Sequence, residues 1–299
     1  MDILSTLSNA LDVLRVLSVI VVLPLYLVVL HAVCRQKKTL SPSFVAIFIS
    51  AGLADIVLLC HYFIFYFLPN VCQPWIELVE RSWFLTTVSM TGIWGFYYAQ
   101  VLGVVCLSFN RYCAVVTPLS YKKGLGKFKL GAILFLQWLL PMLINVPFFV
   151  HPAFYSQIRA NLSQIYPKFV NQEVSDAYYA GSVVFESFIL MPILLLIYAR
   201  IGYSMWKGVR SSPASGGQPA ASVHQQAEKW RAYKLTAVGF VTSFVYLVMA
   251  VSNLAVTLLP IFVNSGQADV YSLWLYFIFI IANHLLCYIT PLSMLCLSE

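Results

Sequence analysis

Long apolar stretches, separated by short polar segments, set the pattern of this chain. They lie near residues 13–33, 43–68, 84–116, 130–150, 180–204, 235–260 and 271–296. A helix crosses the roughly 30 Å hydrocarbon layer of a bilayer in about 20 residues, so each stretch is long enough to span it. The pattern predicts an all-α membrane protein, in which residues 1–299 form a single domain built as a seven-transmembrane helix bundle. The first stretch is too long, and too poor in leading positive charge, for a cleaved signal peptide.

The composition supports a membrane protein. Hydrophobic residues make up 61% of the chain and charged residues 10%, whereas soluble domains are about half apolar and a quarter charged. The net charge of +7 does not indicate nucleic-acid binding. That function needs a basic stripe on one water-facing surface, and here the basic residues lie in short loops between apolar stretches.

The positions of Lys and Arg predict the orientation of the bundle. Of the 18 basic residues, four lie in or beside the N-terminal segment and the even-numbered loops: Arg15, Arg81, Arg159 and Lys168. All the others lie in or beside the first, third and fifth loops. Cytoplasmic loops are the ones enriched in Lys and Arg. We therefore expect the N-terminus outside and the C-terminus in the cytoplasm.

Two loops carry further signals. The triplet at residues 161–163, in the second external loop, makes Asn161 a candidate for N-linked glycosylation, although such triplets also arise by chance. Residues 211–222, in the third internal loop, are rich in Ser, Pro, Gly and Ala, which predicts a flexible linker. No internal repeat is evident, which weakens the case for a transporter built from duplicated halves.

Two acidic residues fall inside apolar stretches, where an unpartnered charge is costly. Asp55 lies in the middle of the second stretch, and Gln100 on the third is a possible partner. The acid is either a functional group or a protonated side chain that hydrogen-bonds a neighbouring helix. Glu186 lies in the outer half of the fifth stretch, before Pro192. It can meet a cationic or hydrogen-bonding ligand, or reach the interface and pair with a neighbour.

Prolines and aromatic residues add detail to the expected bundle. Prolines recur inside the stretches, at Pro24, Pro141, Pro147, Pro192 and Pro291. Each removes a backbone hydrogen bond and is expected to kink its helix, either as a hinge or as static packing. Aromatic residues gather in the outer half of the third stretch and along the seventh, where an interfacial belt is the ordinary explanation. Trp94, Tyr97 and Tyr98 are deeper and are candidates to line an apolar ligand cavity.

Motifs for catalysis and metal binding are missing. The five histidines lie on separate elements without metal-ligand spacing, and no G-x-S-x-G elbow or phosphate-binding loop occurs. We expect no enzyme activity, no metal site and no cofactor. All the cysteines except Cys72 lie in or at the ends of apolar stretches, so we expect free thiols and no disulfide framework.

The most specific motif closes the third stretch. It reads Asn110-Arg111-Tyr112 and is followed, after a short interval, by Pro118-Leu119-Ser120-Tyr121. An arginine is costly at the bilayer centre but tolerated at its edge. Arg111, beside the basic second internal loop, is therefore expected at the cytoplasmic end of the helix, in a functional position. These residues resemble the inner end of helix three and the second internal loop of rhodopsin-like G protein-coupled receptors. That family also has an acid, a tryptophan and a proline matching Asp55, Trp138 and Pro192.

The chain departs from that family in several places. Asn110 stands where the family usually has an acid, which leaves the usual arginine–acid lock without its acid and allows a higher basal activity. Helix six has no C-W-x-P, helix seven reads Thr290-Pro291-Leu292-Ser293-Met294 in place of N-P-x-x-Y, and helix one lacks G-N. No cysteine stands where the family's usual external disulfide would need one. With Leu23-Pro24-Leu25-Tyr26 in helix one, the chain is similar to nematode serpentine chemoreceptors of the Srg superfamily, including its Srv group.

The resemblance implies a chemosensory receptor in the plasma membrane of a sensory cilium, which binds a small external molecule and activates a heterotrimeric G protein. Its site residues would form three groups: Asn110, Arg111, Tyr112 and Pro118 for G protein coupling; Asp55, Gln100, Pro192 and Pro291 for an intramembrane switch; and Trp94, Tyr97, Tyr98 and Glu186 for the ligand pocket.

Two other classes stay open at this point. One is a seven-helix transporter or channel with Asp55 on its path, and the other is a receptor-like protein that traffics or scaffolds without signalling. A seven-helix hydrolase would need clustered His and acid ligands that this chain lacks.

Overall fold

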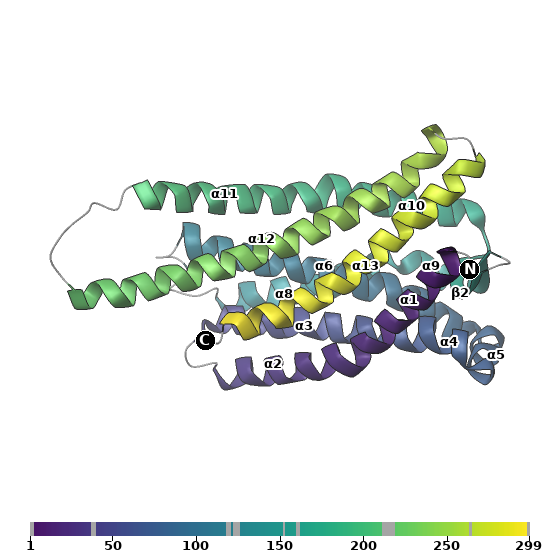
Figure 1. The fold of residues 1–299 in the computed structure, drawn as a ribbon, viewed down its shortest axis with the longest axis horizontal. Coiled ribbons are helices and arrows are strands. Elements are labelled where there is room, and N and C mark those ends of the chain that lie inside the picture. Colours follow the sequence, from purple (N-terminus) through teal and green to yellow (C-terminus); the bar gives the residue numbers. More distant parts are fainter. Residues whose placement is uncertain are drawn as a thin grey trace.

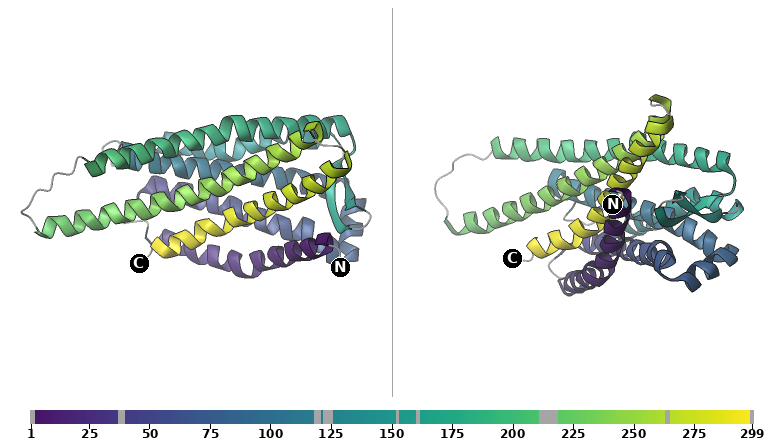
Figure 2. Two further views of the ribbon diagram at one scale, coloured as in Figure 1. Left: turned by 45° about the horizontal axis from the view of Figure 1, so that its top comes forward. Right: turned by 45° about the vertical axis from the view of Figure 1, so that its right-hand side comes forward.

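The computed structural model describes the backbone of all residues except 1–2, 37–39, 118–120, 122–125, 152, 160–161, 211–218, 263–264 and 298–299. The described chain forms a bundle of long helices that lie side by side (Figure 1). The N-terminus lies at one end of the bundle and the C-terminus lies toward the other, and these are named here the N-terminal and C-terminal ends. Helix α12 (Pro219–Phe262) extends past the rest of the bundle at the C-terminal end (Figure 2).

The elements follow the chain in this order: α1 (Ile3–Leu17), η1 (Ser18–Val22), α2 (Leu23–Arg35), α3 (Pro42–Tyr62), η2 (Phe63–Phe67), α4 (Leu68–Val71), α5 (Gln73–Arg81), α6 (Trp83–Val116), α8 (Lys127–Ile144), α9 (Val146–Val150), β1 (Ala153–Arg159), β2 (Leu162–Phe169), α10 (Gln172–Val184), η3 (Phe185–Leu190), α11 (Met191–Arg210), α12 (Pro219–Phe262) and α13 (Ser265–Leu297). Labels with η mark short π-helical turns that join the α-helices on either side.

The described helices have the length and apolarity of membrane spans. Those long and apolar enough to cross a bilayer are Asp12–Arg35, Pro42–Val71, Trp83–Val116, Gln172–Lys207 and Ala237–Leu259. The shorter apolar helices Phe128–Ile144 and Phe277–Ile289 bring the set to the seven expected. The predicted all-α class is thus confirmed, apart from one hairpin, while the exact membrane limits of the seven spans stay a prediction.

Three of the helices contain a π-helical turn directly before a proline. The turns η1, η2 and η3 end just before the Leu-Pro, Leu-Pro and Met-Pro pairs that open α2, α4 and α11. Each pair's first residue donates its N–H to a carbonyl five residues back, as Met191 does to Glu186. Proline has no N–H to donate, and a π turn changes the bonding partner just before it. The prediction from Pro24 and Pro192 of locally altered helix therefore takes the form of π turns.

The structure describes only the last residues of the segment predicted as a flexible linker, 211–222. Residues 211–218 lie outside the described part of the chain, and α12 begins at Pro219, so residues 219–222 are helical. Pro suits the first turn of a helix, where its missing N–H costs nothing, and the alanines that follow are strong helix formers.

A two-stranded hairpin, which the sequence analysis did not predict, lies between α9 and α10. Strands β1 and β2 pair antiparallel, with Ala153 opposite Phe169. Phe169, the last residue of β2, is buried, with its ring stacked on Phe148 at 4.6 Å between centroids and packed against Tyr178 at 6.1 Å. Met90 and Trp94 of α6 complete this apolar group. Hydrophobic packing therefore holds the hairpin against the helices. The six cysteines that the structure describes form no disulfide.

Replacing Phe169 with Ala is expected to loosen the hairpin. Truncating a buried phenylalanine costs about 3–5 kcal/mol in a protein core, and here the loss falls on the contact between β2 and the helices. Amide hydrogen exchange in β1 and β2 should rise by about tenfold or more, while exchange in α6 stays the same. The matched control is Phe154→Ala, because Phe154 lies on β1 and is 45% exposed. Equal exchange in the two variants would show that Phe169 does not anchor the hairpin.

Candidate functional site

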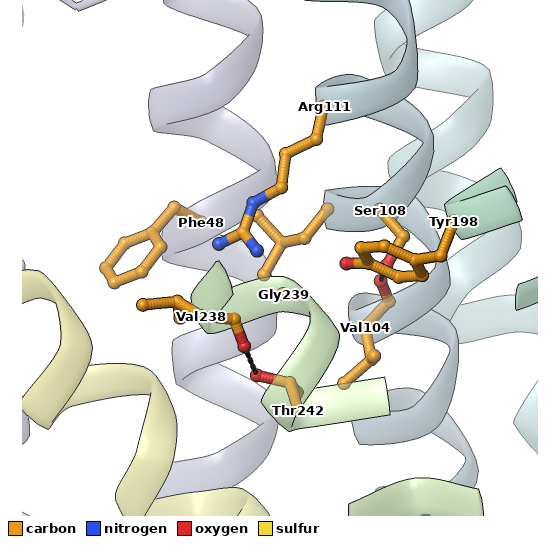
Figure 3. A pocket seen from close by; sticks show the side chains of 9 residues that line it. Phe48, Val104, Ser108, Arg111, Tyr198, Val238, Gly239 and Thr242 are labelled. Atoms are coloured by element: carbon orange, nitrogen blue, oxygen red, sulfur yellow. Dashed lines mark hydrogen bonds between the residues drawn. The ribbon is translucent and has the colours of Figure 1, made fainter. Parts of the chain in front are cut away.

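A small cavity toward the C-terminal end of the bundle holds Arg111 (Figure 3). Its volume is about 20 Å³, enough for about one water molecule. The walls come from α3, α6, α11 and α12, with these lining residues: Phe48, Val104, Leu107, Ser108, Arg111, Tyr198, Val238, Gly239 and Thr242. In the close view the Arg111 side chain extends from α6 toward Gly239 of α12 (Figure 3).

Arg111 lies in this cavity without an acidic partner among the described residues. The ion pairs of the described chain join Asp12 to Arg15 and Glu77 to Arg81. The Nε atom of Arg111 is buried without a hydrogen-bond partner. An arginine carries five N–H donors, so this side chain retains unused capacity to bind a negatively charged or carbonyl-rich partner.

Asn110, the residue in the position of the usual acid, faces away from that cavity. It is buried, and its Nδ2 donates to the hydroxyl of Tyr121 at 3.4 Å. The Tyr121 and Ser41 hydroxyls are hydrogen-bonded at 2.6 Å, and Ser41 caps the start of α3. Asn110 therefore connects the end of α6 to the start of α3. Tyr112, the third residue of the motif, stacks on Phe109 with 6.2 Å between ring centroids.

Asp55 lies in a buried polar group between α2, α3, α6 and α13. Tyr26 donates its hydroxyl hydrogen to the Asp55 carboxyl, and Gln100 lies within interaction range of the same carboxyl. The Gln100 amide nitrogen also donates to the Cys287 sulfur at 3.0 Å. The structure thus brings Asp55 and Gln100 together as predicted and adds Tyr26, whose role the sequence analysis missed. Pro192 lies on α11, outside this group, and Pro291 lies on α13, four residues after Cys287.

A second polar group surrounds Glu186, nearer the N-terminal end. Glu186 is fully buried, and Asn253 of α12 donates to its Oε2 at 3.0 Å. Its other oxygen, Oε1, has no hydrogen bond of regular geometry. The buried hydroxyls of Tyr97 and Tyr98 lie close enough to the carboxyl to interact with it as weak hydrogen-bond donors, and Tyr246 lies within electrostatic range.

Aromatic side chains surround the Glu186 group. Trp94 lies 6.0 Å from Tyr97 and 6.2 Å from Tyr98 between centroids, and Phe185 lies 5.8 Å from Tyr98. The structure therefore brings together the predicted pocket residues Trp94, Tyr97, Tyr98 and Glu186. It adds Tyr246 and Asn253, which the sequence analysis missed. The sequence did offer a signal for them, because both are polar side chains inside the sixth apolar stretch.

A third buried polar group joins α1, α3, η2 and α13. Arg15, predicted only as a charge on the outer side, is 3% exposed and pairs with Asp12 at 2.8 Å. Its guanidinium lies 6.0 Å from the ring centre of Tyr66. Nearby in the bundle core, Asn283 of α13 donates to the Tyr62 hydroxyl at 2.8 Å. An acid three residues earlier on the same helix neutralises Arg15 and allows its burial.

Two predicted sites fall outside the described residues. Pro118, assigned to G protein coupling, and Asn161, the glycosylation candidate, belong to segments whose structure is not described. Both stay predictions from the sequence. Within the described part of the chain, no three His, Cys, Asp or Glu side chains lie close enough together to hold a metal ion.

Apolar helices around buried polar groups, with an arginine in a cavity at one end, form a seven-transmembrane bundle of the kind found in G protein-coupled receptors. The chain belongs to the family described as serpentine type 7TM GPCR chemoreceptor Srv, whose sequence model matches residues 16–299. The predicted family resemblance is thereby confirmed. Membership establishes a multi-pass membrane protein with a receptor role, from a class that binds external ligands and G proteins.

The chain is also similar to a mammalian receptor. It is 31% identical over 109 residues to proteinase-activated receptor 3 of Homo sapiens, a match that covers 35% of this chain and 29% of that protein. The Bos taurus receptor of the same name is 33% identical over 110 residues, covering 35% of this chain and 28% of that protein. The matched part spans less than a third of these curated relatives.

Proposed function

We propose that this receptor binds a small external molecule at the Glu186 group and passes the signal to a heterotrimeric G protein at the Arg111 cavity. The observation that carries this proposal is the single packed cluster that joins the two places. Its members include Tyr97 beside Glu186 and Tyr198 beside Arg111. Because interiors are close-packed, a rearrangement at the Tyr97 end of this cluster changes the packing at the Tyr198 end.

One face of α12 contributes to both places. Asn253 and Tyr246 lie at the Glu186 group, and Thr242 and Gly239 line the Arg111 cavity. Asn253, Tyr246 and Gly239 are spaced seven residues apart, close to two helical turns, so they share one side of the helix. A rotation or tilt of α12 that improves ligand contacts therefore also changes the cavity. Ligand binding shifts the equilibrium only to the extent that the ligand prefers one arrangement.

The pocket chemistry favours a ligand with a cationic or hydrogen-bond-donating group and an aromatic or apolar body. Glu186 has one oxygen without a regular hydrogen bond, tyrosine hydroxyls near it as weak donors, and no basic side chain paired with it in the described chain. A buried carboxylate is stabilised by a charged or hydrogen-bonded partner, and the ring faces around it suit a cation. The charge pattern of the loops supports an external position for the N-terminal end, and a sensory cilium is the expected location.

Guanine-nucleotide exchange on a panel of G protein α-subunits tests the proposal. Membranes carrying the native chain at a measured surface density are assayed with and without a library of small amines and aromatic odorants. We expect exchange on at least one subunit that rises with a subset of the ligands. Absence of exchange on every subunit, from protein shown to be at the surface, would refute the proposal.

A transporter or channel with Asp55 on its path makes a different prediction. Asp55→Asn removes the charge but retains an oxygen that accepts the Tyr26 hydrogen bond. In a receptor, cells with the native chain and with Asp55→Asn should show the same radiolabelled-ligand uptake and the same membrane current as cells without the protein. A flux that is lost in Asp55→Asn and retained in Arg111→Ala would instead identify a transporter.

A further inference from the structure

Gly239 of α12 lines the Arg111 cavity, and its backbone lies close against Arg111 and Tyr198. It is buried, and a methyl group built at its Cα would overlap the Nη1 atom of Arg111 and the hydroxyl of Tyr198. Only a residue without a side chain fits there with its neighbours in their present positions. By contrast, a methyl group at Gly202, on α11, would meet no atom within 4 Å.

The Tyr198 side chain is held firmly in place. The Ser108 hydroxyl donates to the Val104 carbonyl at 2.8 Å, so its oxygen is free to accept the hydroxyl hydrogen of Tyr198 at 3.0 Å. Figure 3 shows the Tyr198 ring lying beside Ser108, with Arg111 and Gly239 on the adjoining side. The ring therefore cannot turn away from Gly239 without losing this hydrogen bond.

Among the side chains that the structure describes, no ion pair stabilises the packing at this place. Asn110 binds Tyr121, and neither ion pair of the described chain includes Arg111. What brings α12 against α6 and α11 here is close packing around Gly239, which leaves the cavity at about 20 Å³. This space is far too small for a protein segment to reach Arg111.

We propose that Gly239 is a closure residue: its missing side chain allows α12 to cover Arg111 and Tyr198, and this packing holds the receptor in its resting state. The inference rests on the proposed function, because it assigns the closed cavity to the uncoupled state. A methyl group at position 239 must move either α12 or the ends of the Arg111 and Tyr198 side chains. The hydrogen bond to Ser108 resists movement of Tyr198, so we expect α12 to move outward, which opens the cavity and favours the coupling arrangement.

Gly239→Ala in the full chain is therefore expected to activate the receptor without ligand. Overpacking a tight contact shifts an equilibrium by on the order of tenfold, so basal guanine-nucleotide exchange should rise by about that factor at equal surface density. The matched control is Gly202→Ala, which adds the same methyl group to α11 in open space. It should leave basal exchange and ligand response at native values.

A distance measurement tests closure without any G protein. Spin labels are attached at positions 117 and 240, both exposed, in a protein whose other accessible cysteines are replaced by Ser. In Gly239→Ala the distribution should gain a longer-distance population that the native protein and Gly202→Ala lack. Native distances in Gly239→Ala would overturn the inference, whatever the exchange assay shows.

The two measurements separate this inference from the proposed function. Longer distances without exchange on any α-subunit would support Gly239 as the closure residue and refute G protein coupling. Should Gly239→Ala fail to reach the surface, the distances are measured on protein purified from whole-cell membranes, because they need neither surface delivery nor a G protein. Combining Gly239→Ala with Tyr198→Phe then removes the hydroxyl that the new methyl group would overlap, so the longer-distance population should shrink. Native distances in Gly239→Ala, or no change on adding Tyr198→Phe, would overturn the inference.

Discussion

Replacing Arg111 with Ala is expected to abolish ligand-evoked guanine-nucleotide exchange while the protein still reaches the cell surface. The side chain lies in the cavity near the C-terminal end with Nε unpartnered, so its removal breaks no ion pair in the described structure. What is lost is the group with free donors that a G protein α-subunit would meet. Exchange in membranes of equal receptor density measures the effect.

The control for Arg111→Ala must remove the same charge from the same end of the bundle. Arg35 serves this purpose, because it ends α2 and is exposed. We expect Arg35→Ala to retain most of the native exchange, since an exposed charge contributes little beyond long-range attraction. If Arg111→Ala couples as well as Arg35→Ala does, the cavity is not the coupling site.

The elements of the fold were predictable to the extent that local sequence determines them. An apolar stretch of about 20 residues fixes a membrane helix by its length and composition alone. The hairpin was missed because its strands lie in a loop that connects two spans, where the seven-helix pattern predicts nothing. The π turns lie before prolines. The sequence analysis predicted altered helix at Pro24 and Pro192, where η1 and η3 lie, but neither its form nor η2 before Pro69.

The polar groups were predictable only in part, because they depend on how helices face one another. Asp55 and Gln100 stand out in apolar stretches, and their proximity follows from two neighbouring helices at similar depth. Tyr26 and Asn253 come from helices whose rotation the local sequence does not specify. Gly239 is the clearest case. A glycine inside a helix looks like a small loss of helix propensity, and only the packed structure shows the Arg111 and Tyr198 side chains against it.

Replacing Glu186 with Gln is expected to weaken the response to cationic ligands while leaving basal exchange near its native level. Glutamine has the size of glutamate and retains an oxygen that accepts the Asn253 hydrogen bond, so the variant changes charge more than packing. Hydrogen bonds to a charged group contribute about 1.5–3 kcal/mol, so ligand potency should fall by roughly 10- to 100-fold. Dose–response curves of exchange at equal surface density measure the change.

The control and the pattern across ligands decide what a loss of potency means. Glu173→Gln removes an exposed carboxylate near the start of α10, on the same long apolar helix, Gln172–Lys207, and should not change potency. Neutral ligands of similar shape should lose less potency in Glu186→Gln than cationic ones, because only the latter gain from the charge. Equal losses for both kinds would mean that Glu186 shapes the pocket through packing. Unchanged potency for all active ligands would place the binding site elsewhere in the bundle, and the aromatic group around Trp94 would then be structural.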